Sequence, residues 1–552
     1  MRSSFFGLNV AITGLYAAQR NLDTVGHNLS NINTEGYSRQ ENIQRASRAM
    51  LTYNGSGMVG TGTEVVSTVR IRDAYLDYKY WSENISLGEW EVKSTQLTEL
   101  ERLFNEPSMN KSGFNAIMDS FFNAISDLSK NPSDLSARRV VINRGVSMAK
   151  YFNSIATHLE KLQSDLNESV KLKVDEINAL ASQIAQLNQK IHTFEVGGDV
   201  ANDLRDQRGV LVDKLSKIIN IDVNEVVVGK LPNGENNTHF VITVSGKALV
   251  DHVNAYKLEV VQRDKKINVE EDIDRLYDVR WEDGNKLEIT GGELKGYLDM
   301  RDGNEGLDQG NGQSPRFKGI PFYIRRLNEF VRKFALAFNE GIVQTAGGTD
   351  SWIKEHAGHA DGYGMQKPGT TVNPTGIRFF TMTGWSNIDN KATELTSDEF
   401  IDNAETVDDI VKRYKMITAK NFSVSGDLLN QQYGEYNLAA SLDSGLGEDN
   451  SNLLNFLDMR ENSHLFSEGT PEDYMTSLIA TLGIDSQQAA QFFSSQENLT
   501  SHIDNRRVSV SGVSINEEMA NLVKFQQAYN ASAKMITTMA EIYDKLINGI
   551  GV

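Results

Sequence analysis

The sequence predicts a mainly α-helical chain with coiled-coil-forming helices at both ends, a long-helix bundle as its body and β-rich domains inserted in the middle. Three observations predict this fold class. All eight prolines lie between Pro107 and Pro471, so both ends lack the residue that interrupts helices. Apolar residues recur at helical spacing at both ends and over residues 159–191. Short β-branched runs between turn residues begin near Ile221.

The N-terminal segment, residues 1–50, is predicted to form a helix that pairs with the C-terminal segment. Its large apolar residues alternate at spacings of four and three, the pattern of a coiled-coil face. The residues expected at an assembly interface are Leu8, Ile12, Leu15, Leu22, Leu29 and Ile32. Turn residues at 33–36 end the helix, and we expect Gly36 in a left-handed conformation with Tyr37 packed where the chain turns.

Residues 51–220 are predicted to begin the helical body. A Gly-rich stretch at 54–62 and a strand-like run at 63–71 come first, and helices are then expected over 73–104, 113–130 and 135–194. The last of these carries ten apolar residues spaced by threes and fours, which indicates one long bundle helix.

The middle of the chain changes character. A β-rich inserted domain is predicted over 221–318, because five β-branched runs lie at 221–228, 239–244, 256–261, 276–281 and 287–290. A return helix of the body is expected over 319–342. Residues 343–404 are predicted to be loop-rich or a small second insert, and the last part of the body, 405–505, contains helices at 406–413 and 471–503.

The C-terminal segment, residues 506–552, carries a second seam that extends over more than four heptads. Its residues expected at the assembly interface are Met519, Leu522, Phe525, Tyr529, Ile536, Tyr543 and Ile547. Burial of a seam residue contributes roughly 1.5–3 kcal/mol, whereas ordering each residue costs about 1–2 kcal/mol. A lone pair of terminal helices is therefore marginal, and we expect both ends to become helical only in an assembled tube. Ordinary packing of the two ends within one chain is the alternative.

Composition excludes several classes of function. The net charge of −19 argues against binding to nucleic acid or to an anionic membrane surface. The absence of cysteine excludes thiol nucleophiles, disulfides and iron–sulfur clusters. The sequence contains no run of 18 apolar residues, so no membrane-spanning helix is predicted. Residues 1–20 are not expected to be a cleaved signal peptide, because polar residues interrupt the apolar stretch.

Three patterns match chemical motifs only in part. Residues 55–60 have the spacing of a dinucleotide fingerprint, but a strand is predicted where a helix must follow. His356, His359 and Asp361 provide three metal-ligand types in a Gly-rich segment without the spacing of a zincin helix, so we expect an exposed loop there. Asp302–Gln313 lacks the last glutamate of a calcium loop and is interpreted as a polar linker. We therefore expect no catalytic, cofactor-binding or metal site.

Four segments carry a family resemblance. Residues 28–39 resemble the motif that follows the N-terminal helix in flagellar rod, hook and hook-associated proteins. The motif residues are Asn31, Asn33, Thr34, Gly36, Tyr37 and Arg39. Residues 65–76, 203–208 and 509–529 are similar to further segments of that superfamily, and residues 203–208 are expected at the end of the long helix. Because rod and hook proteins have β-rich bodies and flagellin lacks the 31–39 motif, the long helix favours the hook-associated protein 1 family.

This resemblance implies a structural junction protein, not an enzyme, with export through the flagellar type III apparatus to the outside of the cell. It implies four partners: hook protein, a second hook–filament junction protein, further copies of the chain in a ring, and an export chaperone at the C-terminal region. Two alternatives remain at this point, which are another axial protein of hook or filament type and a secreted hydrolase carried on flagellar-type ends. No His-Glu-x-x-His segment supports a metalloprotease.

Overall fold

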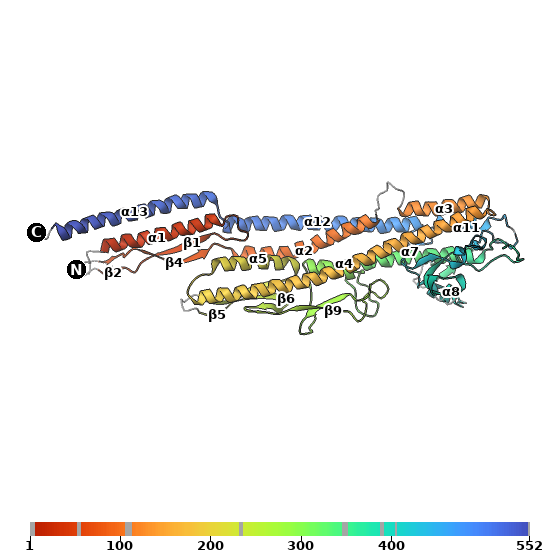
Figure 1. Cartoon of the computed structure of the whole chain (residues 1–552), viewed down its shortest axis with the longest axis horizontal. Helices are drawn as coiled ribbons and strands as arrows, with labels where there is room; N and C mark the ends of the chain where they lie inside the picture. The colour runs from red at the N-terminus through yellow and green to blue at the C-terminus, as the bar shows by residue number, and fades with distance from the viewer. Residues whose placement is uncertain are drawn as a thin grey trace.

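The computed structural model describes residues 6–51, 57–104, 113–230, 236–344, 352–386, 391–402, 404, 406–445 and 447–549. They form an elongated rod whose longest helices run along its axis (Figure 1). Both described chain ends lie at one end of the rod, which we call the terminal end, and the short strands and loops that follow the central helices gather at the opposite, far end. The chain therefore runs out from the terminal end and returns to it.

Three helices span most of the body: α2 (Ala74–Phe104), α4 (Leu135–Val196) and α12 (Pro471–Ser511). α12 lies along α2, and α3 (Phe114–Lys130) packs against α4. All four helices were predicted from the sequence, and the structure confirms them. The mainly helical fold class is confirmed with them.

Helix α4 owes its length to a mainly apolar buried face and to defined ends. The Asp134 carboxylate accepts a hydrogen bond from the backbone N–H of Ser136 and so caps the helix start. Side chains at spacings of three and four, such as Leu159 and Val170, are buried along its whole length. The helix ends at Gly197, and Gly198 follows with a positive φ of 94°.

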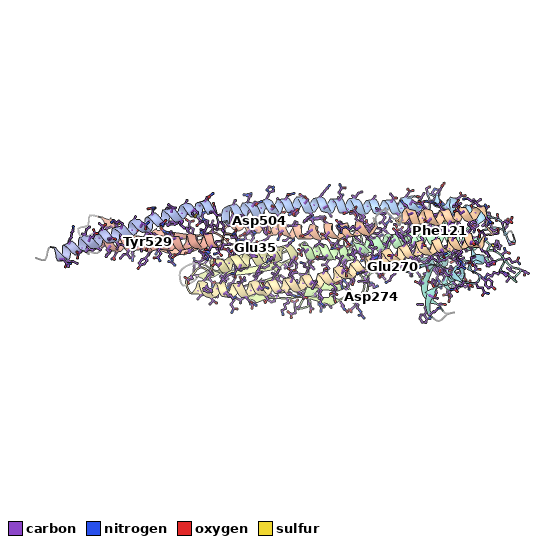
Figure 2. All side chains as sticks on the ribbon, turned by 45° about the horizontal axis from the view of Figure 1, so that its top comes forward. Glu35, Phe121, Glu270, Asp274, Asp504 and Tyr529 are labelled. Carbon is purple, nitrogen blue, oxygen red and sulfur yellow. The ribbon has the colours of Figure 1, made fainter. Side chains whose placement is uncertain are left out.

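Two hydrophobic clusters divide the body along α4. The cluster toward the far end joins α3, the first half of α4 and α7 (Ile320–Glu340) through aromatic side chains such as Phe121 and Phe330. The cluster toward the terminal end joins the second half of α4 to α5 (Asn202–Ile218) and to the strands that follow. Figure 2 shows Phe121 at the far end, distant from Tyr529 at the terminal end.

The strands after α5 form a sheet that covers the second half of α4. Strands β5 (Asp222–Lys230), β6 (Asn236–Val244), β7 (Lys247–Asp251) and β8 (Asn254–Ala255) pair antiparallel in chain order. Strand β9 (Leu258–Gln262) pairs with β10 (Tyr277–Trp281), and α6 (Glu293–Asp302) follows. Asn178 of α4 bonds to both backbone groups of Leu258, so this hairpin is fixed to the long helix.

Two predictions about this region are wrong. Residues 287–290 form no strand. Residues 203–208 do not end the long helix, because α4 stops at Val196 and these residues belong to the separate helix α5. The paired glycines Gly197 and Gly198 allow the chain to reverse between the two helices, which then pack against each other.

The far end consists of short elements around α7. They are β11 (Ile342–Gln344), β12 (Trp352–Lys354), η2 (His359–Asp361), β13 (Phe380–Ser386), β14 (Lys391–Glu394), α8 (Ser397–Ile401), α9 (Val407–Tyr414), β15 (Phe422–Val424), α10 (Gly426–Leu429), η3 (Gly434–Asn437) and α11 (Ser451–Arg460). Strand β13 pairs with both β14 and β15, and Phe380 at its start lies in the core.

The terminal end is built from both extremes of the chain. Helix α1 (Phe6–Ser30) lies beside α13 (Ile515–Asn548) and against the antiparallel pair β1 (Gln40–Ala46) and β4 (Thr63–Arg70) (Figure 1). A smaller pair, β2 (Met50–Leu51) and β3 (Met58–Val59), extends the hairpin. The predicted pairing of the terminal helices is confirmed. Residues 55 and 56 of the dinucleotide-like pattern lie outside the described residues, and β4 follows it.

The structure corrects both remaining motif interpretations. His359 is buried, not in an exposed loop: its Nδ1 bonds to the Ile377 carbonyl and its Nε2 accepts from the Ala439 N–H. Asp302 is likewise no part of a solvated linker, because its buried carboxylate forms ion pairs with Arg263 and Arg301. Among the described residues no group of three or more potential ligands could hold a metal ion, and no helix is long and apolar enough to cross a membrane.

We expect Gly88→Ala to destabilise the body, because a Cβ at residue 88 would lie 2.1 Å from the carbonyl oxygen of Lys217 and would force α2 away from α5. The expected loss is about 1–3 kcal/mol in urea unfolding. The matched control is Gly483→Ala in α12, where a Cβ meets open space and better helix propensity should stabilise by about 0.5–1 kcal/mol. Equal effects of the two changes would contradict the close approach of α2 and α5.

We expect the stability of the far-end core to fall with acid. Burial lowers the pKa of His359 to about 4, below the value near 6.5 of an unfolded histidine. The folded chain therefore binds fewer protons, and stability is lost as pH falls from about 6.5 toward 4. The loss between pH 7.5 and 5 should be about 2 kcal/mol by linkage, measured by urea unfolding. A smaller pH dependence in His359→Gln would support this assignment, whereas an unchanged one would contradict it.

Candidate assembly interface and the neck that positions it

Helices α1 and α13 approach each other closely at small residues. A Cβ at Gly7 would lie 2.9 Å from Cε of Met539, and one at Gly14 would lie 3.2 Å from the hydroxyl of Ser532. The two glycines are seven residues apart on α1, and so are their partners on α13. This heptad spacing keeps one face of each helix on the other, as in a coiled coil.

The buried face of α1 lies one residue away from the large side chains predicted for the interface. The buried residues are Ala11, Ala17, Ala18, Asn21, Val25 and Asn28. All six apolar residues predicted at this end, from Leu8 to Ile32, are only half-buried. The contacts within one chain therefore use small and amide side chains, while the leucines and isoleucines flank them.

The face of α13 toward α1 is also incompletely covered. Leu522, Phe525, Tyr529, Ile536 and Tyr543 of the predicted seam are half-buried. Met519 and Ile547 are 47% and 62% exposed, and Val523, Met535, Ile542 and Leu546 are exposed as well. Of the residues of α13, only Glu518 is fully buried. Because only one of its side chains is fully buried, α13 gains little stabilisation from contacts within one chain.

The motif between α1 and β1 forms a tight turn against the body. The N–H of Tyr37 donates to the carbonyl of Thr34, and Gly36, at the third position of this turn, has a φ of +73°. The left-handed conformation predicted for Gly36 is confirmed, although α1 itself ends earlier, at Ser30. A Cβ at residue 36 would lie 2.2 Å from Val210 of α5, so the turn touches the body where only glycine fits.

Two other motif residues tie the turn to both terminal helices. The hydroxyl of Tyr37 donates to Oδ1 of Asn28, and Asn28 bonds to backbone groups of Gln40 and to Oε2 of Glu518. Arg39 forms ion pairs with Glu518 at 2.9 Å and with Glu517 at 2.8 Å. Burial, together with nearby carboxylates, raises the pKa of the Tyr37 hydroxyl, which therefore remains a donor.

The remaining motif residues lie at the surface of the turn. Asn31 donates from Nδ2 to the carbonyl of His27, and the Thr34 hydroxyl donates to Oδ1 of Asn31. Asn33 is exposed. These three residues shape the turn, whereas Tyr37 and Arg39 connect it to other elements.

Asp206 of α5 is the main contact between the terminal end and the body. Its carboxylate accepts hydrogen bonds from the N–H and hydroxyl of Ser38, each at 2.8 Å, and from Arg70 at 2.7 Å. Arg72 lies 3.8 Å away and donates to the Ser38 hydroxyl and to Asp77 of α2. We call these contacts, with those of Asn28 and Arg39 described above, the neck.

The helix that leads into α13 is anchored beside the neck. Arg507 of α12 forms an ion pair with Asp213 at 2.8 Å, and its guanidinium lies 4.0 Å from the ring centre of Tyr80. Burial and the charge of Asp213 raise the pKa of Tyr80 to about 12. The carbonyl of Ser511, the last residue of α12, accepts from the N–H of Arg39. The orientation of α13 is thereby set by the body.

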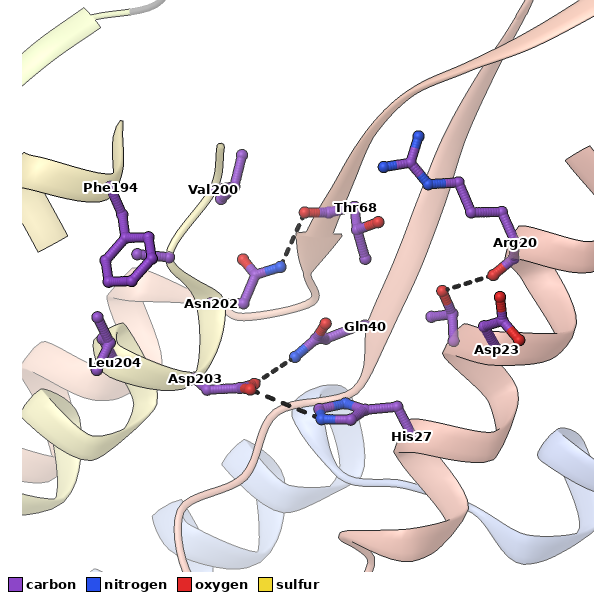
Figure 3. Close-up of a pocket in the computed structure, with 12 residues that line it drawn as sticks. Arg20, Asp23, His27, Gln40, Thr68, Phe194, Val200, Asn202, Asp203 and Leu204 are labelled. Atoms are coloured by element: carbon purple, nitrogen blue, oxygen red, sulfur yellow. Dashed lines mark hydrogen bonds and ion pairs between the residues drawn. The ribbon is translucent and has the colours of Figure 1, made fainter. Parts of the chain in front are cut away.

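A cleft of about 570 Å³ separates α1 from the corner between α4 and α5 (Figure 3). Asp203 bridges it, with a hydrogen bond from Gln40 and an ion pair to His27 at 3.6 Å, and Asn202 donates to the carbonyl of Thr68. Phe194, 56% exposed, lines the opposite wall.

Sequence reasoning missed most of the neck. Asn28, Ser38, Arg70, Arg72, Asp206 and Glu518 were not predicted as site residues. Each nevertheless falls within one of the four segments that carried the family resemblance. Those segments are far apart in the chain, and the structure shows that they meet at the neck.

Replacement of Asp206 by Asn should loosen the neck. Removal of one partner from a buried, hydrogen-bonded charge pair costs about 2–5 kcal/mol, because Arg70 loses its counter-charge while Arg72 keeps Asp77. Amide exchange over residues 36–40 and 63–70 should then accelerate while α4 remains protected. Asp203→Asn is the control, since its exposed pair with His27 contributes less than about 1 kcal/mol. Unchanged exchange in the Asp206 variant would show that the carboxylate does not hold the neck.

Comparison with known proteins agrees with this geometry. Residues 97–351 match the helical domain of the flagellar hook-associated protein FlgK, residues 8–37 match the flagella basal body rod protein family, and residues 505–549 match the C-terminal family of the flagellar basal body rod FlgEFG proteins. Flagellar hook-associated protein 1 of Escherichia coli is 26% identical over 98% of this chain and 99% of its own length.

A solved structure has the same fold. The flagellar hook junction protein FlgK from Burkholderia pseudomallei matches 80% of this chain and all of its own with a TM-score of 0.51 at 13% identity. Flagellar hook-associated protein 1 of Bacillus subtilis is 30% identical over all of this chain and 99% of its own length. The chain therefore belongs to the flagellar hook-associated protein 1 family, structural proteins of the hook–filament junction outside the cell.

Proposed function

We propose that this protein joins hook to filament by packing its two terminal helices against those of neighbouring subunits in a tube. The observation that carries the proposal is the incomplete burial of α1 and α13. Their large apolar residues flank the contact within one chain and stay half-exposed or exposed along both helices. Further helices on either side would bury them and supply the stabilisation that a single pair lacks.

The partners follow from this geometry and from the family. Copies of the chain would lie side by side as a ring, with hook protein below and the second hook–filament junction protein above. Each would present terminal helices of the same kind. The neck supports this arrangement, because polar contacts hold the helix pair at a defined angle to the body while leaving its apolar flanks free.

Before assembly, the same exposed residues would favour nonspecific association with other proteins. A helix that exposes Met519, Val523, Ile542 and Leu546 presents an apolar surface to any other protein in the cell. We propose that an export chaperone covers this C-terminal region until the chain leaves through the flagellar type III apparatus. The absence of cysteine suits export as an unfolded chain, since no disulfide can form on the way.

Single-chain contacts predict weak order at the terminal end. Amide exchange on the purified monomer should show low protection across α1 and α13 and high protection in α4, because Glu518 is the one fully buried residue of α13. Protection of both terminal helices as strong as that of α4 would contradict the proposal that neighbours stabilise them.

Two exposed residues on one face of α13 test the proposed interface directly. Met535→Glu with Ile542→Glu places two charges where neighbouring helices would pack, and desolvating each charge is costly. With this variant as the only copy in the cell, electron microscopy should show hooks without filaments, and filament subunits should be released into the medium.

The control adds the same two charges without removing apolar groups. Gln527→Glu with Asn530→Asp changes exposed polar residues of α13, so filaments should grow. Circular dichroism of both purified variants checks that the body keeps its helix content. Normal filaments on the Met535 and Ile542 variant would refute the assignment of this face.

A further inference from the structure

Three histidines from three elements meet where the sheet covers the corner between α4 and α5. They are His192 near the end of α4, His239 on β6 and His252 in the turn between β7 and β8. The rings of His239 and His252 are stacked, with centres 4.1 Å apart and planes 5° apart. His192 meets His252 edge-on at 5.3 Å. We call these three side chains the histidine cluster.

The backbone of His252 is tied to both helices of the corner. Its carbonyl accepts a hydrogen bond of 2.7 Å from Nδ2 of Asn188 on α4. Oδ1 of Asn188 in turn accepts from Arg208 of α5 at 2.9 Å, and the Arg208 guanidinium lies 3.7 Å from the ring centre of Phe240. The turn that carries His252 is therefore one of the places where the sheet contacts the helices through polar groups, together with the ion pair between Arg205 of α5 and Glu225 of β5.

The surroundings of His252 disfavour a positive charge. The titratable groups that face it are His192 from α4, His239 from β6, Arg208 from α5 and Asp251 from β7, and of these only Asp251 is acidic. Its buried Nδ1 has no hydrogen-bond partner among the described residues. Burial lowers the pKa of His252, and His239, His192 and Arg208 lower it further, while Asp251 opposes them.

We infer that the histidine cluster is a proton-sensitive clasp, which holds strands β6 to β8 on the α4–α5 corner when neutral and releases them when protonated. Neutral imidazoles stack favourably, whereas a proton on His252 creates a cation that is repelled by the nearby Arg208. A second proton on the stacked partner would place two like charges about 4 Å apart.

The direction of the pH effect follows from the lowered pKa of His252. The folded state binds fewer protons than the unfolded one, so the clasp is closed above pH about 6.5 and is lost as pH falls below that value. The effect can extend beyond the sheet, because helix α5 carries Arg208 and also Asp203 and Asp206 of the cleft and neck. This inference does not depend on the proposed partners.

Amide exchange of the full-length purified chain at pH 7.5 and 5.5 tests the clasp. Protection factors, which correct for intrinsic exchange, should fall over residues 239–255 at the lower pH, because the folded state binds fewer protons than the unfolded one. His252→Asn should abolish the fall, since asparagine does not titrate and tolerates the positive φ of 51° at this position. His502→Gln, on an exposed histidine of α12, should behave as the wild type.

Further arms separate the clasp from other causes. His239→Gln should also abolish the fall and serves if His252→Asn does not fold by circular dichroism. Titration of His359 changes exchange in the far-end core instead, around residues 356–380. EDTA at pH 7.5 should leave residues 239–255 protected. Loss of protection on adding EDTA would show that a bound metal ion, and not the neutral state of the histidines, holds the strands, and would contradict the inference. Equal protection of the wild type at both pH values, or an unchanged fall in both histidine variants, would overturn the inference.

Discussion

The structure depends on one contact, the carboxylate of Asp206 between the turn at Ser38 and two arginines, Arg70 at the end of β4 and Arg72 just after it. Helices α1 and α13 have few buried side chains of their own, so their orientation is not set by a core. It is set instead by polar groups that accept only one geometry: a carboxylate with four nearby donor groups, a glycine without room for a Cβ, and Arg39 between two glutamates. Directional bonds of this kind specify an angle better than apolar contacts do.

The division between body and terminal end has a physical reason. The body has two hydrophobic clusters and can be stable as a single chain. Helix α1 buries alanine, asparagine and valine, α13 buries only Glu518, and the leucines and isoleucines of both helices stay half-buried or exposed. Such a chain has a hydrophobic core over most of its length and leaves apolar side chains exposed at the terminal end. That arrangement suits the assembly proposed above, in which neighbouring subunits cover the terminal helices.

Much of the fold could be predicted from the sequence, because helices such as α2, α4 and α12 have long apolar periods and proline or glycine at their ends. Both terminal helices were predicted for the same reason. Periodicity alone could not give the exact contact face of α1. A seam of Gly7, Ala11, Gly14 and Ala18 has little hydrophobic signal, although small residues permit the closest approach.

The neck and the buried polar groups were harder to predict. Ser38 and Asp206 are 168 positions apart in the sequence, and no local pattern connects them. His359 and Asp302 were interpreted as surface residues because their segments are rich in glycine and polar residues. Only the folded chain supplies the carbonyl, amide and guanidinium partners that make their burial possible.

The chain runs along the rod between α1 and α13, with both described ends at one end of the rod and the short elements between α7 and α12 at the other. Lengthening or replacing a far-end loop changes nothing in the register between Gly7, Gly14 and α13. Sequence changes, or a fused reporter, at the far end therefore leave the contact between α1 and α13 unchanged. A tag at either chain extreme would instead adjoin α1 or α13, the helices of the proposed interface.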